Sequence, residues 1–111
     1  MTSKLIQLSQ AAANDVREIE SYTLSNFGEK QTLQFLEKLE ASLALLATMP
    51  EMGMQRPEFD PPQHQFRYHA ILSSFVVVYE ETSEFIRIAR IIHGARSLLA
   101  ELMKDAGSES V

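Results

Sequence analysis

The chain has 111 residues, of which 45% are hydrophobic and 23% are charged, and its formal net charge at pH 7 is −5. These values exclude a largely disordered chain and predict a single folded domain over residues 1–106, followed by a small, polar tail over 107–111 that should fray. The lack of cysteine excludes disulfides and thiolate chemistry, no apolar run is long enough to span a membrane, and the acidic balance argues against a surface that grips nucleic acid throughout.

The first half of the sequence predicts a short strand followed by two amphipathic helices. The strand is expected over residues 4–8, and Ser9 is suited to cap a helix over residues 10–27. Gly28 should end that helix, and a second helix should run over residues 29–48 until Pro50 stops it. Because the link is so short, the helices should form an antiparallel hairpin.

The apolar faces of this hairpin are predicted to be core, and the charged residues of its first helix are predicted to turn mostly outward. The expected core positions are Ala12, Val16, Ile19, Thr23 and Phe27 in the first helix and Leu33, Phe35, Leu36, Leu39, Leu43, Leu45 and Leu46 in the second, and the outward residues are Asp15, Arg17, Glu18 and Glu20.

The second half predicts an irregular segment and then three strands. Residues 50–65 hold all four prolines, which should forbid regular structure there. Strands are expected over residues 66–72, 75–80 and from residue 85 onward, and their short links require antiparallel pairing. A short helix is expected over 97–106. The fold class is therefore α+β, with an N-terminal strand, an antiparallel helix hairpin packed on an antiparallel β-meander, and a short C-terminal helix (β-α-α-β-β-β-α).

The stretch from Phe85 to Arg96 combines an apolar run with arginines. Strict alternation places Ile86, Ile88, Arg90 and Ile92 on one face and Phe85, Arg87, Ala89, Ile91 and His93 on the other. Both faces are mostly apolar, which predicts a strand covered on both sides. Cationic and titratable groups collect where this strand ends, and that corner is the candidate functional site.

No phosphate-binding loop, metalloprotease motif or nucleophile elbow is present, and no metal or cofactor is expected. The residues that remain for chemistry are Arg67, His69, Arg87, Arg90, His93 and Arg96. Arginine forks suit phosphate, and a histidine near neutral pH can transfer protons, as RNA cleavage requires. Alternatively, the arginines pair with acids of the hairpin or with Glu80 and Glu84, and His93 merely ends a strand. Residue types alone leave both interpretations open.

Several short motifs occur in an order that is similar to a known family. They are Ala13 to Ile19 with Tyr22, then Leu39 and Glu40 with Leu43, Leu46 and Ala47, then Pro50, Gly53 and Arg56, then Arg67, and finally Arg90 to Arg96. Over residues 4–100 the chain thereby resembles the ParE toxins of the RelE/ParE superfamily, the toxic half of bacterial toxin–antitoxin pairs.

The resemblance implies a RelE/ParE-like fold and a cytoplasmic, non-enzymatic toxin. Such a toxin inhibits DNA gyrase by protein contact, the A-type subunit of gyrase being the expected partner, and is neutralised by a cognate antitoxin. It implies target binding by Arg90, His93 and Arg96, no cofactor or metal, and no sequence-specific nucleic-acid binding. Two alternatives are a ribosome-dependent mRNA endoribonuclease of RelE type, with Arg67, Arg90, His93 and Arg96 catalytic, and a degenerate member that only binds antitoxin.

Overall fold

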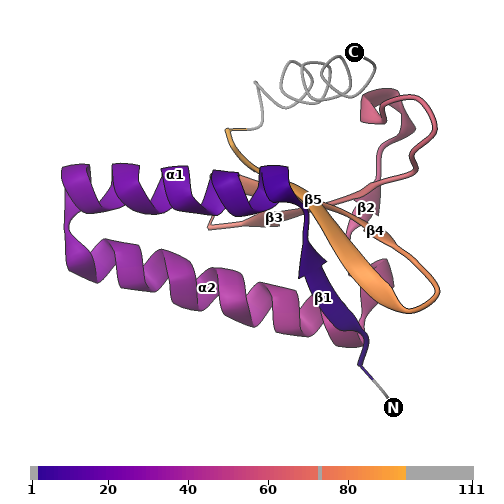
Figure 1. The fold of residues 1–111 in the computed structure, drawn as a ribbon, viewed down its shortest axis with the longest axis horizontal. Helices are drawn as coiled ribbons and strands as arrows, with labels where there is room; N and C mark the ends of the chain where they lie inside the picture. Colours follow the sequence, from indigo (N-terminus) through magenta and orange to yellow (C-terminus); the bar gives the residue numbers. More distant parts are fainter. Residues whose placement is uncertain (1–2, 73, 95–111) are drawn as a thin grey trace.

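The computed structural model describes residues 3–72 and 74–94, which form a helical hairpin packed on one face of a five-stranded sheet (Figure 1). The helices are α1 (Gln10–Phe27) and α2 (Glu29–Thr48), and the strands are β1 (Leu5–Leu8), β2 (Met54–Gln55), β3 (Arg67–Ile71), β4 (Phe75–Glu81) and β5 (Phe85–His93). The predicted α+β class is confirmed, as are the antiparallel hairpin and the β3–β4–β5 meander. The helix predicted over 97–106 and the tail over 107–111 lie outside the described residues.

Strand β5 lies inside the sheet because β1 pairs with it in parallel on one side and β4 pairs with it antiparallel on the other. The β1 register runs from Leu5 opposite Phe85 to Leu8 opposite Ile88. Apolar side chains of β5 are buried on both faces of the sheet, as the sequence predicted.

The prediction that residues 50–65 lack regular structure is wrong. Met54 and Gln55 form the edge strand β2, which pairs antiparallel with β3, and short 3₁₀ helices cover Pro50–Met52 and Pro57–Phe59. Both 3₁₀ helices begin at a proline, where the missing N–H has no helical partner to lose. The prolines therefore leave the backbone of Met54 and Gln55 available to the sheet.

A β-bulge at Ala89 changes which face the end of β5 presents. Tyr79 pairs with Ile88 and Val78 pairs with Arg90, so Ala89 is an extra residue on β5. The faces predicted by strict alternation are therefore wrong beyond Ile88, because one inserted residue shifts every later side chain to the other face. Ile86, Ile88 and Ile91 pack in the cluster that includes the helices, whereas Ala89 and Ile92 pack in the cluster on the opposite face.

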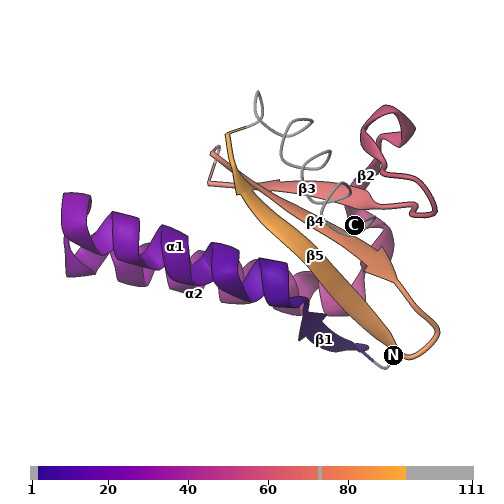
Figure 2. The ribbon, with the colours of Figure 1, turned by 45° about the horizontal axis from the view of Figure 1, so that its top comes forward.

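The buried stripe of the hairpin is narrower than predicted. Ala12, Phe35, Leu39 and Leu46 are buried, but Phe27, Leu33 and Leu45 are 57%, 60% and 45% exposed. Phe27 is exposed because the hairpin projects well beyond the sheet at its turn (Figure 2). Leu33 and Leu45 are next in sequence to buried residues of α2, Thr32 and Leu46, but lie at the edge of its buried stripe.

Two small residues set the bounds of α1. Gly28 has a φ of +90°, which a glycine adopts without a Cβ penalty, and its N–H donates to the carbonyls of Thr23 and Leu24. Ser9 caps the other end, because its Oγ accepts from the N–H of Ala12 at 3.0 Å. Both predicted bounds of α1 are confirmed.

Replacing Ser9 by alanine should lower the free energy of unfolding by about 1–2 kcal/mol. The change removes the helix cap and also the bond that the Ser9 hydroxyl donates to the Ala89 carbonyl at 2.8 Å. Urea denaturation followed by circular dichroism measures the effect, with Ser21→Ala on the exposed side of α1 as the matched control. A loss no larger than that of the control would contradict the prediction.

Candidate functional site

The far half of β5 is completed by α1 instead of by another strand. β1 ends at Leu8, opposite Ile88, and no other strand among residues 3–72 and 74–94 pairs with the backbone of β5 beyond that point on this side. The Ser9 N–H donates to the Ile88 carbonyl at 2.9 Å, and the Asp15 carboxylate accepts from the Ile91 N–H at 2.9 Å. The first turns of α1 therefore satisfy the open edge and hold the end of β5 in place.

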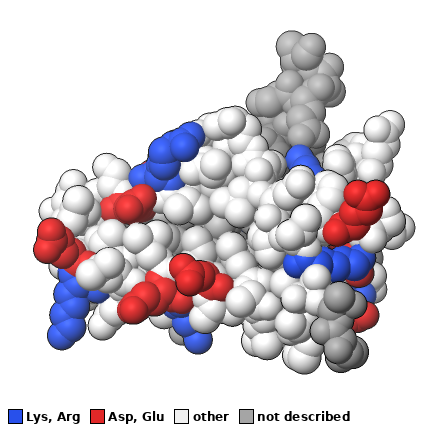
Figure 3. All heavy atoms as spheres, turned by 60° about the horizontal axis from the view of Figure 1, so that its bottom comes forward, with Lys and Arg blue, Asp and Glu red and all other residues white. Residues whose placement is uncertain are grey.

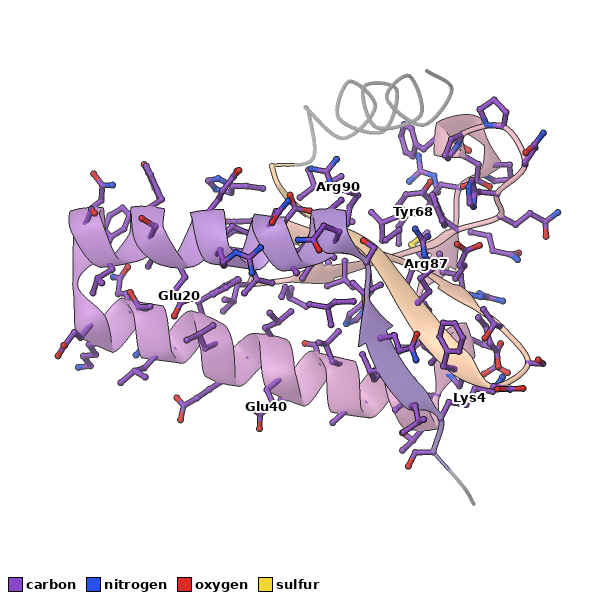
Figure 4. The ribbon with its side chains drawn as sticks, viewed as in Figure 1. Lys4, Glu20, Glu40, Tyr68, Arg87 and Arg90 are labelled. Atoms are coloured by element: carbon purple, nitrogen blue, oxygen red, sulfur yellow. The ribbon has the colours of Figure 1, made fainter. Side chains whose placement is uncertain are left out.

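Asp15 also binds the guanidinium of Arg90 in a bidentate pair. Arg90 Nε lies 2.8 Å from Asp15 Oδ2 and Nη2 lies 2.8 Å from Oδ1, and Figure 4 shows Arg90 beside the N-terminal turns of α1. The two side chains are only 13% and 11% exposed. The prediction that Asp15 turns outward is wrong, because Asp15 is three residues after Ala12 and four before Ile19 and so shares their inward face. That spacing is the feature of the sequence that indicates an inward position for Asp15.

The other arginines that the sequence singled out are engaged elsewhere. Arg87 pairs with Glu80 at 2.8 Å, and Arg67 donates to the Gly53 carbonyl at 2.9 Å. Arg67 is opposite Tyr79 and His93 is opposite Phe75, so Arg67 is four residues along β4 from the level of His93, or about 13 Å. The structure does not bring Arg67 to His93.

Arg96 lies outside the described residues, and His69 is on β3 opposite Val77. The pKa of His69 is lowered, first by burial and then by the positive charge of Lys38. Both effects favour the neutral form of the His69 imidazole.

His93 is the last residue of β5 and is exposed. Its ring stacks on Phe75, which is opposite it in the sheet, with ring centroids 4.8 Å apart and planes inclined by 26°. Gly94 follows with a φ of +85°, and its N–H donates to the Ser74 carbonyl at 2.7 Å. The stack and the glycine turn present His93 at a defined corner of the sheet.

A groove of about 630 Å³ opens beside this corner, between the overhanging part of the hairpin and the β3–β4 turn. We call it the hairpin groove, and its lining is Glu18, Ile19, Tyr22, Thr23, Phe27, Gln31, Gln34, Phe35, Leu72, Ser74, Phe75 and His93. Tyr22, Phe27 and Leu72 are 56%, 57% and 44% exposed. Exposed aromatic groups with a polar rim are typical of protein-binding surfaces. The sequence interpretation missed the groove because Phe27 has the spacing of a core residue.

The described residues offer little to other kinds of site. Among them no three potential metal ligands lie close enough together to hold an ion. None of the helices in residues 3–72 is long and apolar enough to cross a membrane.

Comparisons with known proteins place this geometry in context. The family described as "ParE toxin of type II toxin-antitoxin system, parDE" matches residues 6–98. No curated protein matches the sequence. Among solved structures, a chain of the "Chromosomal ParDE TA system from P. aeruginosa" is similar with a TM-score of 0.67 at 17% identity, over 83% of this chain and 97% of that chain. At that identity the similarity concerns the fold.

Proposed function

This chain belongs to the ParE family of toxins of type II toxin–antitoxin systems, and from that premise we propose that it inhibits DNA gyrase by protein–protein contact. The A-type subunit of gyrase is the proposed contact, the cytoplasm is the proposed location, and a cognate antitoxin neutralises the toxin. The action is non-enzymatic and involves no sequence-specific binding of nucleic acid.

The observation that carries the proposal is that three of the four arginines considered for phosphate binding, the three that the structure describes, already have partners inside the molecule. Arg90 binds Asp15, Arg87 binds Glu80, and Arg67 binds the backbone of Gly53. A ribonuclease needs cations placed around a reacting phosphate, next to its acid–base group. The distance between the level of Arg67 and His93 supports a docking surface over such a centre.

The proposed target surface is the corner at His93 together with the adjoining hairpin groove. His93 and the exposed rings of Tyr22 and Phe27 contact the target, because large aromatic groups at an exposed groove supply most binding energy per residue. Arg96 remains a proposed target-binding residue. Arg90 contributes by fixing the end of β5 through Asp15.

Induction of the chain in bacteria without its antitoxin tests this function. We expect filamentation and a DNA-damage response at a normal rate of translation, and the purified chain should inhibit supercoiling by purified gyrase. Arrested translation with cleaved mRNA would favour the RelE-type endoribonuclease instead. Growth without any toxicity would indicate a degenerate member that only binds antitoxin.

Replacing His93 by alanine should raise the concentration needed for half-inhibition of gyrase by about 5- to 20-fold, since one contact of a larger surface is lost. His93 is exposed, so circular dichroism should show an unchanged fold. His64→Ala is the matched control, because His64 lies beside Glu80 and far along the sheet from His93. An unchanged inhibition constant would remove His93 from the target surface.

A further inference from the structure

A second groove lies on the outer side of α2 and has an apolar floor with an acidic rim. We call it the α2 groove; it has a volume of about 400 Å³, and its lining is Leu33, Leu36, Glu37, Glu40, Ala41 and Ala44. None of these residues lines the hairpin groove. The two grooves are therefore separate surfaces of the same hairpin.

The groove arises from the residue spacing of α2. Leu33, Glu37, Glu40 and Ala44 recur at intervals of four, three and four residues, which places them on one helical face, away from the buried stripe. The short side chains of Ala41 and Ala44 leave the hollow, and Leu33 stands beside it with 60% of its surface exposed. A single exposed leucine is ordinary, but Leu33 lines the same hollow as Leu36 and two alanines, so the apolar surface is larger than one side chain.

The rim of the α2 groove is negatively charged. Glu37 and Glu40 are both exposed, and neither forms an ion pair with any residue that the structure describes. Figure 4 shows Glu40 pointing outward from α2, and Figure 3 shows acidic side chains together with basic ones over the helical half of the molecule. α2 carries three acidic and two basic residues, and both charged residues that line the groove are acidic.

We propose that the α2 groove binds a basic amphipathic helix of the cognate antitoxin. Apolar side chains of that helix fill the hollow over Ala41 and Ala44, and flanking lysines or arginines pair with Glu37 and Glu40. Charge selects this occupant, because an acidic segment would be repelled and a basic one attracted by the same rim. The inference rests on the proposed function only in that a toxin of this family has an antitoxin partner.

The test is the double variant Glu37→Lys/Glu40→Lys, titrated with the purified cognate antitoxin by isothermal calorimetry. We expect the Kd of the variant to rise at least about 30-fold at low ionic strength. The difference in Kd between the variant and the wild type should become smaller as added salt screens the ion pairs. The matched control is Glu51→Lys/Glu84→Lys, which changes the net charge equally at exposed positions outside the groove. Leu33→Gln, an uncharged change to a helix-compatible residue, should raise the Kd by about 5- to 10-fold.

A groove variant that binds the antitoxin with the Kd of the wild type would overturn the proposal. An equal rise of the Kd in the groove and control variants would also overturn it, because it would show attraction to the overall charge. A wild-type chain that self-associates in sedimentation, with the groove variant monomeric and antitoxin affinity unchanged, would assign the groove to a second copy of the chain. Gyrase inhibition by the groove variant is measured in parallel and should match the wild type. If neither the wild type nor the groove variant inhibits gyrase, the proposed function is refuted. The titration still decides whether the antitoxin binds at the α2 groove.

Discussion

Replacing Asp15 by alanine should lower the free energy of unfolding by about 3–5 kcal/mol, the cost of leaving a buried charge without its partner. The carboxylate accepts from Nε and Nη2 of Arg90 and from the N–H of Ile91, and all three donors would be left inside the protein. A fall in the melting temperature of about 10 °C or more is expected for a domain of this size. Urea and thermal denaturation measure both quantities.

Two further variants separate the charge from the shape of Asp15. Asp15→Asn keeps one acceptor for the Ile91 N–H but loses the ionic pair, so it should cost less than alanine does. The double variant Asp15→Ala/Arg90→Met removes both charges and should recover part of the stability, because no unpaired buried cation remains. Glu18→Ala, an exposed change on the same helix, should stay within about 0.5 kcal/mol of the wild type. A loss from Asp15→Ala as small as that of Glu18→Ala would contradict the role assigned to the pair.

Replacing Gly53 by alanine should cost about 2–4 kcal/mol, through overpacking and the loss of a buried hydrogen bond. A Cβ at this position would stand 2.6 Å from Tyr79 Oη and 2.8 Å from Tyr79 Cε1. Tyr79 is fully buried, accepts from the Gly53 N–H at 2.8 Å and donates to the Pro50 carbonyl at 2.7 Å. The ring therefore cannot move aside without breaking the bonds that hold the start of the 50–65 segment to the sheet.

The double variant Gly53→Ala/Tyr79→Phe tests this explanation. Removing the hydroxyl deletes the closest contact, so the double variant should lose less stability than the sum of the two single variants. Gly28→Ala is the contrasting control, because nothing lies within 4 Å of its added Cβ and only its φ of +90° is strained, which should cost about 1 kcal/mol. Additive losses in the double variant would show that the hydroxyl is not the source of the clash.

The helices were predictable because their limits depend on neighbouring residues. Ser9 caps α1 with a bond to Ala12, Gly28 supplies a backbone conformation that ends it, and Pro50 follows α2. The strands β3, β4 and β5 were predictable for a similar reason, since short links force neighbours to pair. The end of β5 at His93 was also predicted from the sequence and is confirmed.

The partners of the charged residues were not predictable in the same way. Asp15 and Arg90 are 75 residues apart in the sequence, and their meeting depends on where α1 crosses the edge of β5. The bulge at Ala89 and the strand β2 depend on registers between distant segments, which periodicity cannot specify. The hairpin groove exists because Tyr22 and Phe27 lie on the part of the hairpin that overhangs the sheet.

By itself, then, the sequence determined the order of the two helices and of strands β1, β3, β4 and β5, the family resemblance and the place of His93 at the end of β5, because these follow from local spacing and local chemistry. Only the tertiary structure decided that Arg90 is a buried partner of Asp15, and that grooves open beside both α1 and α2. The physical reason is that burial and ion pairing depend on contacts between segments far apart in the chain, which no local pattern specifies.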